Sequence, residues 1–190
     1  LMKNNSIGIY GGSFNPFHKG HEYVIYNSKK ELGLDKYYII PNYENPLKTK
    51  ISKDPIHETL KKLRLETLDL NVKVSPIEFS IKSQNTYQLL TRIQKKCHLK
   101  NFVLIIGLDQ LWELDKWVNF EWIVNNISIC IVHRPGYDMD IEKSHIYNKF
   151  SKYFMNSLEK FLTSSSPNLF FLKIEGLEIS STDIRNRLDR

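Results

Sequence analysis

The sequence predicts an α/β fold in which a doubly wound parallel sheet is covered by helices on both faces. Short strings that are apolar throughout, such as 102–106 and 127–132, are typical of strands buried on both sides. Longer amphipathic segments separate these strings, as expected of crossover helices. Hydrophobic residues make up 41% and charged residues 25% of the 190 residues, proportions that exclude disordered, collagen-like and disulfide-scaffold proteins.

Strand and helix patterns alternate in the first half of the chain, joined by a glycine-rich turn and a polar loop. Pro55 suits the first turn of a helix, because its missing N–H would have no helical partner there. Leu89, Leu90 and Ile93 share one face of a helical pattern. We therefore expect strands at 7–10, 36–41 and 72–79, a loop at 42–53, and helices at 19–32, 55–68 and 86–97.

The second half continues this alternation and ends on a capping motif. Gly107 ends one buried strand, and Arg134-Pro135-Gly136-Tyr137 breaks the chain after the next. Ser180, Ser181 and Thr182 are favoured N-cap residues, so they begin a closing helix. We expect strands at 102–106, 127–132 and 169–174, helices at 112–124 and in the polar segment up to Leu162, and a single domain over 1–190.

Charge and cysteine content narrow the class of protein. The formal net charge of +6 would suit a nucleic-acid-binding module, although such a module leaves the motifs described below unexplained. No apolar run is long enough to span a bilayer, and the N-terminus lacks the apolar core of a signal peptide. Two cysteines, Cys97 and Cys130, indicate buried thiols in a reducing compartment. We expect a cytoplasmic protein without a membrane or nucleic-acid partner, and homo-oligomerisation remains open.

The ends of the sequence carry one further expectation. Leu1 precedes Met2, and the chain stops a few residues after its last motif. These ends suggest a trimmed chain, and the sequence leaves open whether the natural C-terminus extends beyond Arg190.

The first chemical motif follows the first strand and runs into the first helix. Paired glycines let the backbone approach a ligand closely, and the N-terminus of the helix attracts anions. Two histidines three residues apart share a face of the first turn, where their imidazoles can donate to phosphate oxygens. The motif reads Gly11-Gly12-Ser13-Phe14-Asn15-Pro16-Phe17-His18-Lys19-Gly20-His21.

Other interpretations of this motif are weaker. The glycine spacing fits neither a dinucleotide fingerprint nor a Walker A loop, and Asn15 stands where a nucleophile elbow requires glycine. His18 and His21 could bind a metal, although no third ligand lies nearby in sequence. They could also simply cap the helix. Phosphate binding remains the interpretation that explains the most residues.

The second motif, Ile179-Ser180-Ser181-Thr182-Asp183-Ile184-Arg185, lies near the end of the chain. Ser181 and Thr182 suit a helix start. Arg185 is the informative residue, because a cation in the first turn opposes the helix dipole unless an anion is bound there. Asp183 could satisfy the arginine instead.

Together the two motifs resemble the signatures of the HxGH nucleotidyltransferase superfamily, G-G-[ST]-F-[DN]-P-x-H-x-G-H and I-S-S-T-x-I-R. Within it, the chain looks like the bacterial-type nicotinate (nicotinamide)-nucleotide adenylyltransferases, on residues 41–48, Thr86, 107–109, Trp117 and 133–137. The resemblance covers nearly the whole chain. It implies a Rossmann-like nucleotidyltransferase fold and adenylyl transfer from ATP to nicotinate mononucleotide, with nicotinamide mononucleotide as a second acceptor. The products would be deamido-NAD or NAD, plus pyrophosphate, in NAD biosynthesis.

The resemblance also implies roles for the matching residues. His18 and His21 would orient ATP and stabilise charge at its α-phosphate, and Arg185 would hold the outer phosphates. Mg²⁺ would arrive with ATP rather than at a protein metal site. ATP binding is implied for Gly11, Gly12, Ser13, Phe14, Gly20, Lys48, Gly107, Asp109, Ile179, Ser181 and Thr182, and pyridine-nucleotide binding for Asn42, Thr86, Trp117 and Arg134. Without the resemblance, Asp109 would be interpreted as a helix cap and Trp117 as a core residue.

Two segments depart from the family pattern. Asn45-Pro46-Leu47-Lys48 replaces P-P-H-K, and Gln84-Asn85-Thr86-Tyr87-Gln88 stands where S-Y-T-x-D is usual. These departures concern the acceptor more than the phosphates of ATP. Phosphopantetheine adenylyltransferases and cytidylyltransferases share the histidine motif and therefore remain alternatives.

Overall fold

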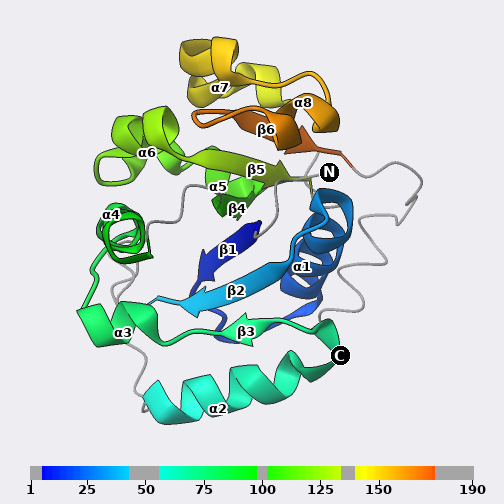
Figure 1. The fold of residues 1–190 in the computed structure, drawn as a ribbon. Helices are drawn as coiled ribbons and strands as arrows, with labels where there is room; N and C mark the ends of the chain where they lie inside the picture. Colours follow the sequence, from blue (N-terminus) through cyan, green and yellow to red (C-terminus); the bar gives the residue numbers. More distant parts are fainter. Residues whose placement is uncertain (1–5, 43–55, 98–101, 134–139, 174–190) are drawn as a thin grey trace.

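The molecule is organised by one parallel sheet. The computed structural model describes residues 6–42, 56–97, 102–133 and 140–173. Within them, six strands are ordered β3-β2-β1-β4-β5-β6 (Figure 1). They are β1 (Ile7–Gly12), β2 (Lys36–Pro41), β3 (Lys73–Val74), β4 (Phe102–Gly107), β5 (Ser128–Val132) and β6 (Leu169–Leu172). The order reverses between β1 and β4, where sheets of this type bind ligands beyond the carboxyl ends of the strands. The predicted doubly wound fold is confirmed.

Helices cover both faces of the sheet. One face packs against α1 (Lys19–Leu32), α2 (Ile56–Glu66) and α8 (Leu158–Thr163). The other carries α4 (Thr86–Cys97), α5 (Leu108–Leu111), α6 (Phe120–Asn126) and α7 (His145–Phe150). Neighbouring strand residues point into opposite layers: Leu104 packs with the α4 side and Ile105 with the α1 side.

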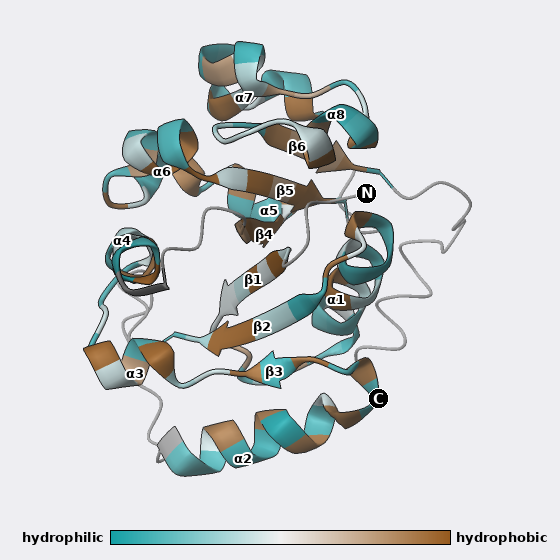
Figure 2. Cartoon of the chain, in the orientation of Figure 1, coloured by the Kyte–Doolittle hydropathy of each residue, from teal (hydrophilic) through white to brown (hydrophobic). Residues whose placement is uncertain are grey.

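The central strands are apolar because both of their faces are covered. Every residue of β4 and β5 is buried, and Figure 2 shows these strands among the most hydrophobic parts of the ribbon. Cys130 on β5 is a buried free thiol, as the sequence predicted. The side chain of Cys97 lies outside the described part. No helix among the described residues is long and apolar enough to cross a membrane.

The strand predicted at 72–79 is wrong beyond its first residues. The strand β3 covers only Lys73–Val74, and a short helix α3 (Ile77–Ile81) follows. The N–H of Ser75 makes a last bond to the carbonyl of Ile39, 2.9 Å away. Pro76 comes next, and its ring nitrogen has no proton to donate to a ladder. The chain therefore leaves the sheet at this proline.

The continuous helix predicted at 112–124 is also wrong. Helix α5 starts earlier, a 3-10 turn η2 (Leu114–Lys116) follows it, and α6 begins only at Phe120. Trp117 is extended and Asn119 has a φ of 51°, so the backbone between the two helices is not helical. The segment leading to Leu162 is helical only in pieces, which are η3 (Ile141–Lys143), α7, η4 (Ser151–Tyr153) and α8.

Most other predicted elements match the structure, with small differences at their ends. Helix α2 is followed by a 3-10 turn η1 (Leu68–Leu70) rather than reaching Leu68 itself. The last strand ends at Leu172. The loop after Asn42, the break at 134–137 and the closing helix at 180–182 lie outside the described residues.

Candidate active site

The turn between β1 and α1 is built around the buried ring of Phe14. This residue has a φ of 45°, a left-handed backbone that is unusual for an aromatic residue. Its ring is 3% exposed and lies edge-on to Tyr10 and His21, with centroids 5.3 and 5.0 Å away. A Cβ on Gly12 would come within 3.1 Å of the same ring, so a larger residue there would have to displace the ring. The side chain of Phe14 is therefore part of the core rather than of an open surface.

His18 and His21 cap the first turn of α1 reciprocally. The Nδ1 of His18 accepts from the N–H of Gly20 at 3.2 Å, and the Nδ1 of His21 accepts from the N–H of His18 at 3.3 Å. The two imidazoles stack with centroids 3.7 Å apart and planes at 23°. The capping interpretation of the histidines is therefore correct, and it determines which ring nitrogens can donate to a ligand.

Capping fixes which nitrogen of each ring carries the proton. An Nδ1 that accepts from a backbone N–H holds no proton, so each neutral ring has its N–H at Nε2. Both Nε2–H groups are donors in the first turn of a fourteen-residue helix, whose N-terminus carries partial positive charge. Phe17 stacks on His21 at 5.5 Å and limits its movement. The arrangement suits an anion with several oxygens.

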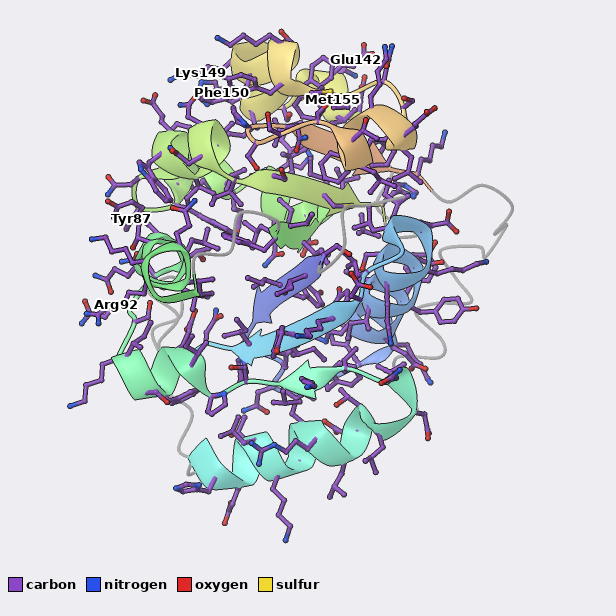
Figure 3. The ribbon with its side chains drawn as sticks, in the orientation of Figure 1. Tyr87, Arg92, Glu142, Lys149, Phe150 and Met155 are labelled. Atoms are coloured by element: carbon purple, nitrogen blue, oxygen red, sulfur yellow. The ribbon has the colours of Figure 1, made fainter. Side chains whose placement is uncertain are left out.

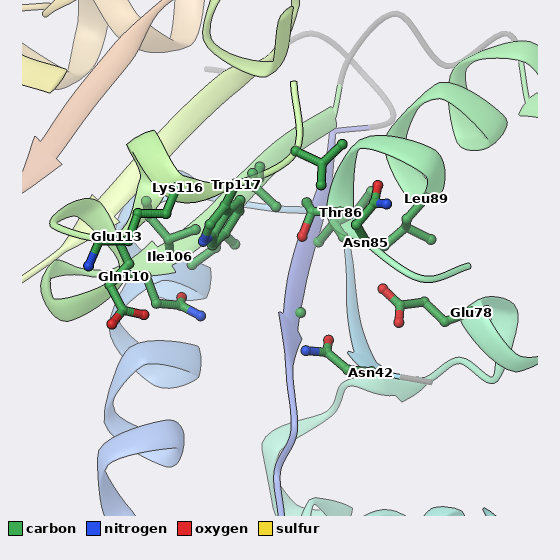
Figure 4. A pocket seen from close by; sticks show the side chains of 15 residues that line it. Asn42, Glu78, Asn85, Thr86, Leu89, Ile106, Gln110, Glu113, Lys116 and Trp117 are labelled. Atoms are coloured by element: carbon green, nitrogen blue, oxygen red, sulfur yellow. The ribbon is translucent and has the colours of Figure 1, made fainter. Parts of the chain in front are cut away.

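A second feature, a pocket of about 220 Å³, opens at the carboxyl edge of the sheet on the α4 side (Figure 4). Its floor comes from strand residues of β1 and β4, and its walls come from the starts of α3, α4 and α5 and from the end of η2. The lining residues are Ile9, Gly11, Asn42, Glu78, Asn85, Thr86, Leu89, Leu104, Ile105, Ile106, Gln110, Glu113, Lys116, Trp117 and Val118. Whole-ligand pockets are typically about 300–1,000 Å³, so this one suits a single substituted ring.

Packing holds the walls of the pocket in place. The N–H of Asn42 donates to the carbonyl of Gly12 at 2.9 Å, which ties the end of β2 to the end of β1. Tyr87, labelled in Figure 3, lies at the start of α4. Its ring lies edge-on to that of Trp122 of α6, with centroids 5.1 Å apart, and fixes the start of α4. Thr86, which precedes Tyr87, is thereby held at the pocket.

Gly11 connects the two features. It lines the pocket, and the residues after it lead into the histidine turn. The histidines begin the helix that covers one face of the sheet, whereas the pocket opens on the other face. A Cβ placed on Gly11 would find its nearest atoms at 3.9 Å, so the space beside this residue is open. A ligand that reaches from the pocket to the histidines must cross the end of β1 at the two glycines.

The structure therefore gathers several of the predicted residues. Asn42, Thr86 and Trp117 come from separate segments of the chain and meet at one pocket, as expected of residues that bind the same ligand. Gly107 caps α5 and Asp109 lies in its first turn, so Asp109 is not the helix cap that its sequence context alone suggested. Trp117 both lines the pocket and packs on the core. The remaining predicted residues, Lys48, Arg134, Ile179, Ser181, Thr182 and Arg185, lie outside the described part.

Sequence reasoning missed two polar residues of the pocket. Glu78 is 3% exposed and lies in the first turn of α3, in a segment that the sequence assigned to a strand. Gln110 lies three residues after Gly107, a capping-box spacing that could have been recognised. In the described ranges, no group of three His, Cys, Asp or Glu side chains could hold a metal ion.

Comparisons with known proteins agree with this geometry. A family model described as cytidylyltransferase-like matches residues 9–187. The chain belongs to this family. The probable nicotinate-nucleotide adenylyltransferase of Rhizobium etli (strain CIAT 652) is 30% identical over 182 residues, 95% of both chains. That of Clostridium novyi (strain NT) is 30% identical over 188 residues, 95% of this chain and 86% of the relative. The resemblance predicted from the two motifs is confirmed, and with it the assignment to the nucleotidyltransferases.

A solved structure supports the fold. Plasmodium falciparum nicotinic acid mononucleotide adenylyltransferase, complexed with APC in one structure and with NaAD in another, is 19% identical to the chain. It aligns over 96% of this chain and 83% of its own, with a TM-score of 0.66. At this identity the similarity concerns the fold alone.

Proposed function

We propose that the chain transfers the adenylyl group of ATP to nicotinate mononucleotide and releases pyrophosphate, forming deamido-NAD. The observation that carries this is the pairing of two Nε2–H donors at the start of α1 with a ring-sized pocket on the other side of the two glycines. The names of the relatives support the same acceptor. Nicotinamide mononucleotide is the second acceptor to consider.

In this proposal the pyridine ring occupies the pocket near Trp117 and Thr86. The ribose and 5′-phosphate extend past Gly11 and Gly12 toward the histidines, where the α-phosphate of ATP is held. A 5′-phosphate oxygen attacks the α-phosphorus, a new P–O bond forms, and the bond to the β-phosphate oxygen breaks. Pyrophosphate leaves with the electron pair of that bond, and no covalent enzyme intermediate is needed.

The protein contributes positioning and charge stabilisation to this step. Alignment of two bound reactants can lower a barrier by roughly 7–11 kcal/mol. Each preorganised donor aimed at developing negative charge contributes roughly 2.7–4 kcal/mol. His18 and His21 would donate from Nε2 to an α-phosphate oxygen, and Arg185 with Ser181 and Thr182 would hold the outer phosphates. The donor substrate is MgATP, since Mg²⁺ binds readily to phosphate oxygens and water.

The partners and location follow from the same proposal. The chain would bind ATP and a pyridine mononucleotide rather than a nucleic acid. A cytoplasmic location suits an enzyme that uses ATP and keeps the thiol of Cys130 free.

Pyrophosphate release tests the donor and the reaction class. The protein is incubated with Mg²⁺, nicotinate mononucleotide and either ATP or CTP, and pyrophosphate is measured by a coupled enzyme assay. Release that requires both ATP and the mononucleotide supports the proposal. Preference for CTP, or release with phosphopantetheine in place of the mononucleotide, would assign the chain to another branch of the family.

A further inference from the structure

The side-chain amide of Gln110 is held in one orientation. Its Oε1 accepts from the N–H of Gly107 at 3.2 Å and so caps the start of α5. A backbone N–H can only donate, so the amide atom facing Gly107 must be the oxygen. The NH₂ group consequently faces away from the helix start.

This NH₂ group belongs to the pocket. Gln110 lines it together with Thr86 and Trp117, and in Figure 4 its amide reaches toward the space that these side chains enclose. Among the described residues, no side chain or carbonyl accepts a hydrogen bond from the Nε2 of Gln110. The pocket wall thus presents a group that donates and cannot accept.

The opposite wall carries the acidic residue Glu78, which has an interaction of its own. Glu78 is 3% exposed, lines the same pocket from α3, and approaches it in Figure 4 from the side opposite Gln110. Glu113 and Lys116, whose charges are opposite, are both exposed at the pocket. A bound ring is therefore placed between Glu78 on one wall and the amide donor of Gln110 on the other.

We propose that Gln110 selects the acceptor, by donating from Nε2 to the carboxylate on the pyridine ring of the mononucleotide. This inference rests on the proposed function. The carboxylate of such a nucleotide can accept from the donor that Gln110 places on the pocket wall. A hydrogen bond between an amide donor and a carboxylate is stronger than one to a neutral amide oxygen, so the nicotinate form binds better than the nicotinamide form.

Replacement of Gln110 with glutamate tests the inference. One carboxylate oxygen can still accept from Gly107, while the other turns the donor wall into an acceptor wall. The ratio of kcat/KM for nicotinate mononucleotide to that for nicotinamide mononucleotide should fall about 10- to 100-fold in Gln110→Glu. The KM for ATP should stay within threefold of wild type. An unchanged ratio in the active variant would overturn the inference.

Gln94→Glu is the control for net charge. Gln94 lies on α4, outside the segment 84–88, and does not line the pocket. The same change at this position should leave the ratio of kcat/KM values for the two acceptors unaltered. A fall in this ratio equal to that in Gln110→Glu would show an effect of net charge and contradict a role for Gln110.

A second variant covers the case in which Gln110→Glu does not fold. Gln110→Met keeps the volume and removes the donor, so it should lose discrimination between the two acceptors without inverting it. Retained discrimination would contradict the inference. The wild-type protein is assayed in parallel with both pyridine mononucleotides. If it used neither of them, the proposed function itself would fail, and this result would be distinct from a failure of the inference about Gln110.

Discussion

Two substitutions of His21 separate the structural contact of its Nδ1 from the proposed catalytic contact of its Nε2. Its Nδ1 accepts from the N–H of His18, and its Nε2–H is the donor proposed for the α-phosphate. Asparagine places an oxygen close to the position of Nδ1 and nothing at Nε2. Glutamine places an amide nitrogen close to the position of Nε2 and leaves the N–H of His18 without that acceptor.

The expected magnitudes follow from the contacts of the ring. In His21→Asn the cap bond is kept, while the ring contacts with Phe14 at 5.0 Å and His18 at 3.7 Å are lost. Aromatic pairs contribute about 0.5–1.5 kcal/mol each, so the loss of two should make unfolding easier by about 1–3 kcal/mol, or about 2–12 °C in Tm. The loss of one preorganised donor should lower kcat about 10²- to 10³-fold.

The assay combines steady-state pyrophosphate release with thermal unfolding of both variants. His21→Gln should retain at least about tenfold more kcat than His21→Asn, because it keeps a donor near the phosphate. It should also be the less stable of the two, since loss of a cap costs about 0.5–2 kcal/mol. A kcat for His21→Asn close to that of wild type would refute the catalytic role, and equal kcat values for the two variants would refute the division between the two nitrogens.

Three further predictions follow from particular contacts. A Cβ on Gly8 would lie 2.6 Å from the Cδ1 of Leu34, so Gly8→Ala should lower stability by about 1–3 kcal/mol in urea unfolding. Gly11→Ala should unfold like wild type, because the space beside Gly11 is open. Equal losses of stability in the two variants would contradict the close packing around Gly8. Burial raises the pKa of Cys130 above its ordinary value of 9.0, so the folded thiol stays protonated where the unfolded one ionises. Stability should therefore fall as pH rises above 9, by up to about 1.4 kcal/mol per pH unit, and Cys130→Ala should flatten this slope. Trp117→Ala should raise the KM for the pyridine mononucleotide about 10- to 100-fold but leave the KM for ATP unchanged, whereas equal increases in both would place Trp117 outside the acceptor site.

The parts of the fold that the sequence predicted are those where local pattern and burial agree. Strands β4 and β5 are covered on both faces, so they are almost entirely apolar and their ends were predicted to within one residue. Helix α1 was predicted with its observed ends, because His18 caps its start and Gly33 ends it with a left-handed φ of 57°. In these elements the local sequence pattern and the burial of the residues indicate the same conformation.

The errors arose where tertiary contacts override local preference. The residues around Trp117 have a helical pattern, yet the backbone opens there and Trp117 lies against the pocket and the core. Glu78 was overlooked because its segment had been assigned to a strand, although Pro76 marks the exit from the sheet. No sequence pattern indicates that a glutamate on a short helix will be buried at a pocket whose other walls come from distant segments.

The candidate site could be predicted in part for a related reason. The histidine motif is contiguous, so the orientation of its two imidazoles follows from local helix capping. The pocket is assembled from the ends of β1 and β2 and the starts of α4 and α5, so only the family resemblance connected Asn42, Thr86 and Trp117 in advance. The family resemblance did not indicate Gln110 as a residue of this pocket.

Competition between acceptors in a single reaction tests the central claim most directly. The protein is given MgATP with equal concentrations of nicotinate mononucleotide, nicotinamide mononucleotide and phosphopantetheine, and the adenylylated products are identified by mass at low conversion. We predict that deamido-NAD forms fastest and dephospho-coenzyme A does not form. Predominant transfer to phosphopantetheine, or no transfer to either pyridine nucleotide, would contradict the assignment of the pocket to a pyridine ring.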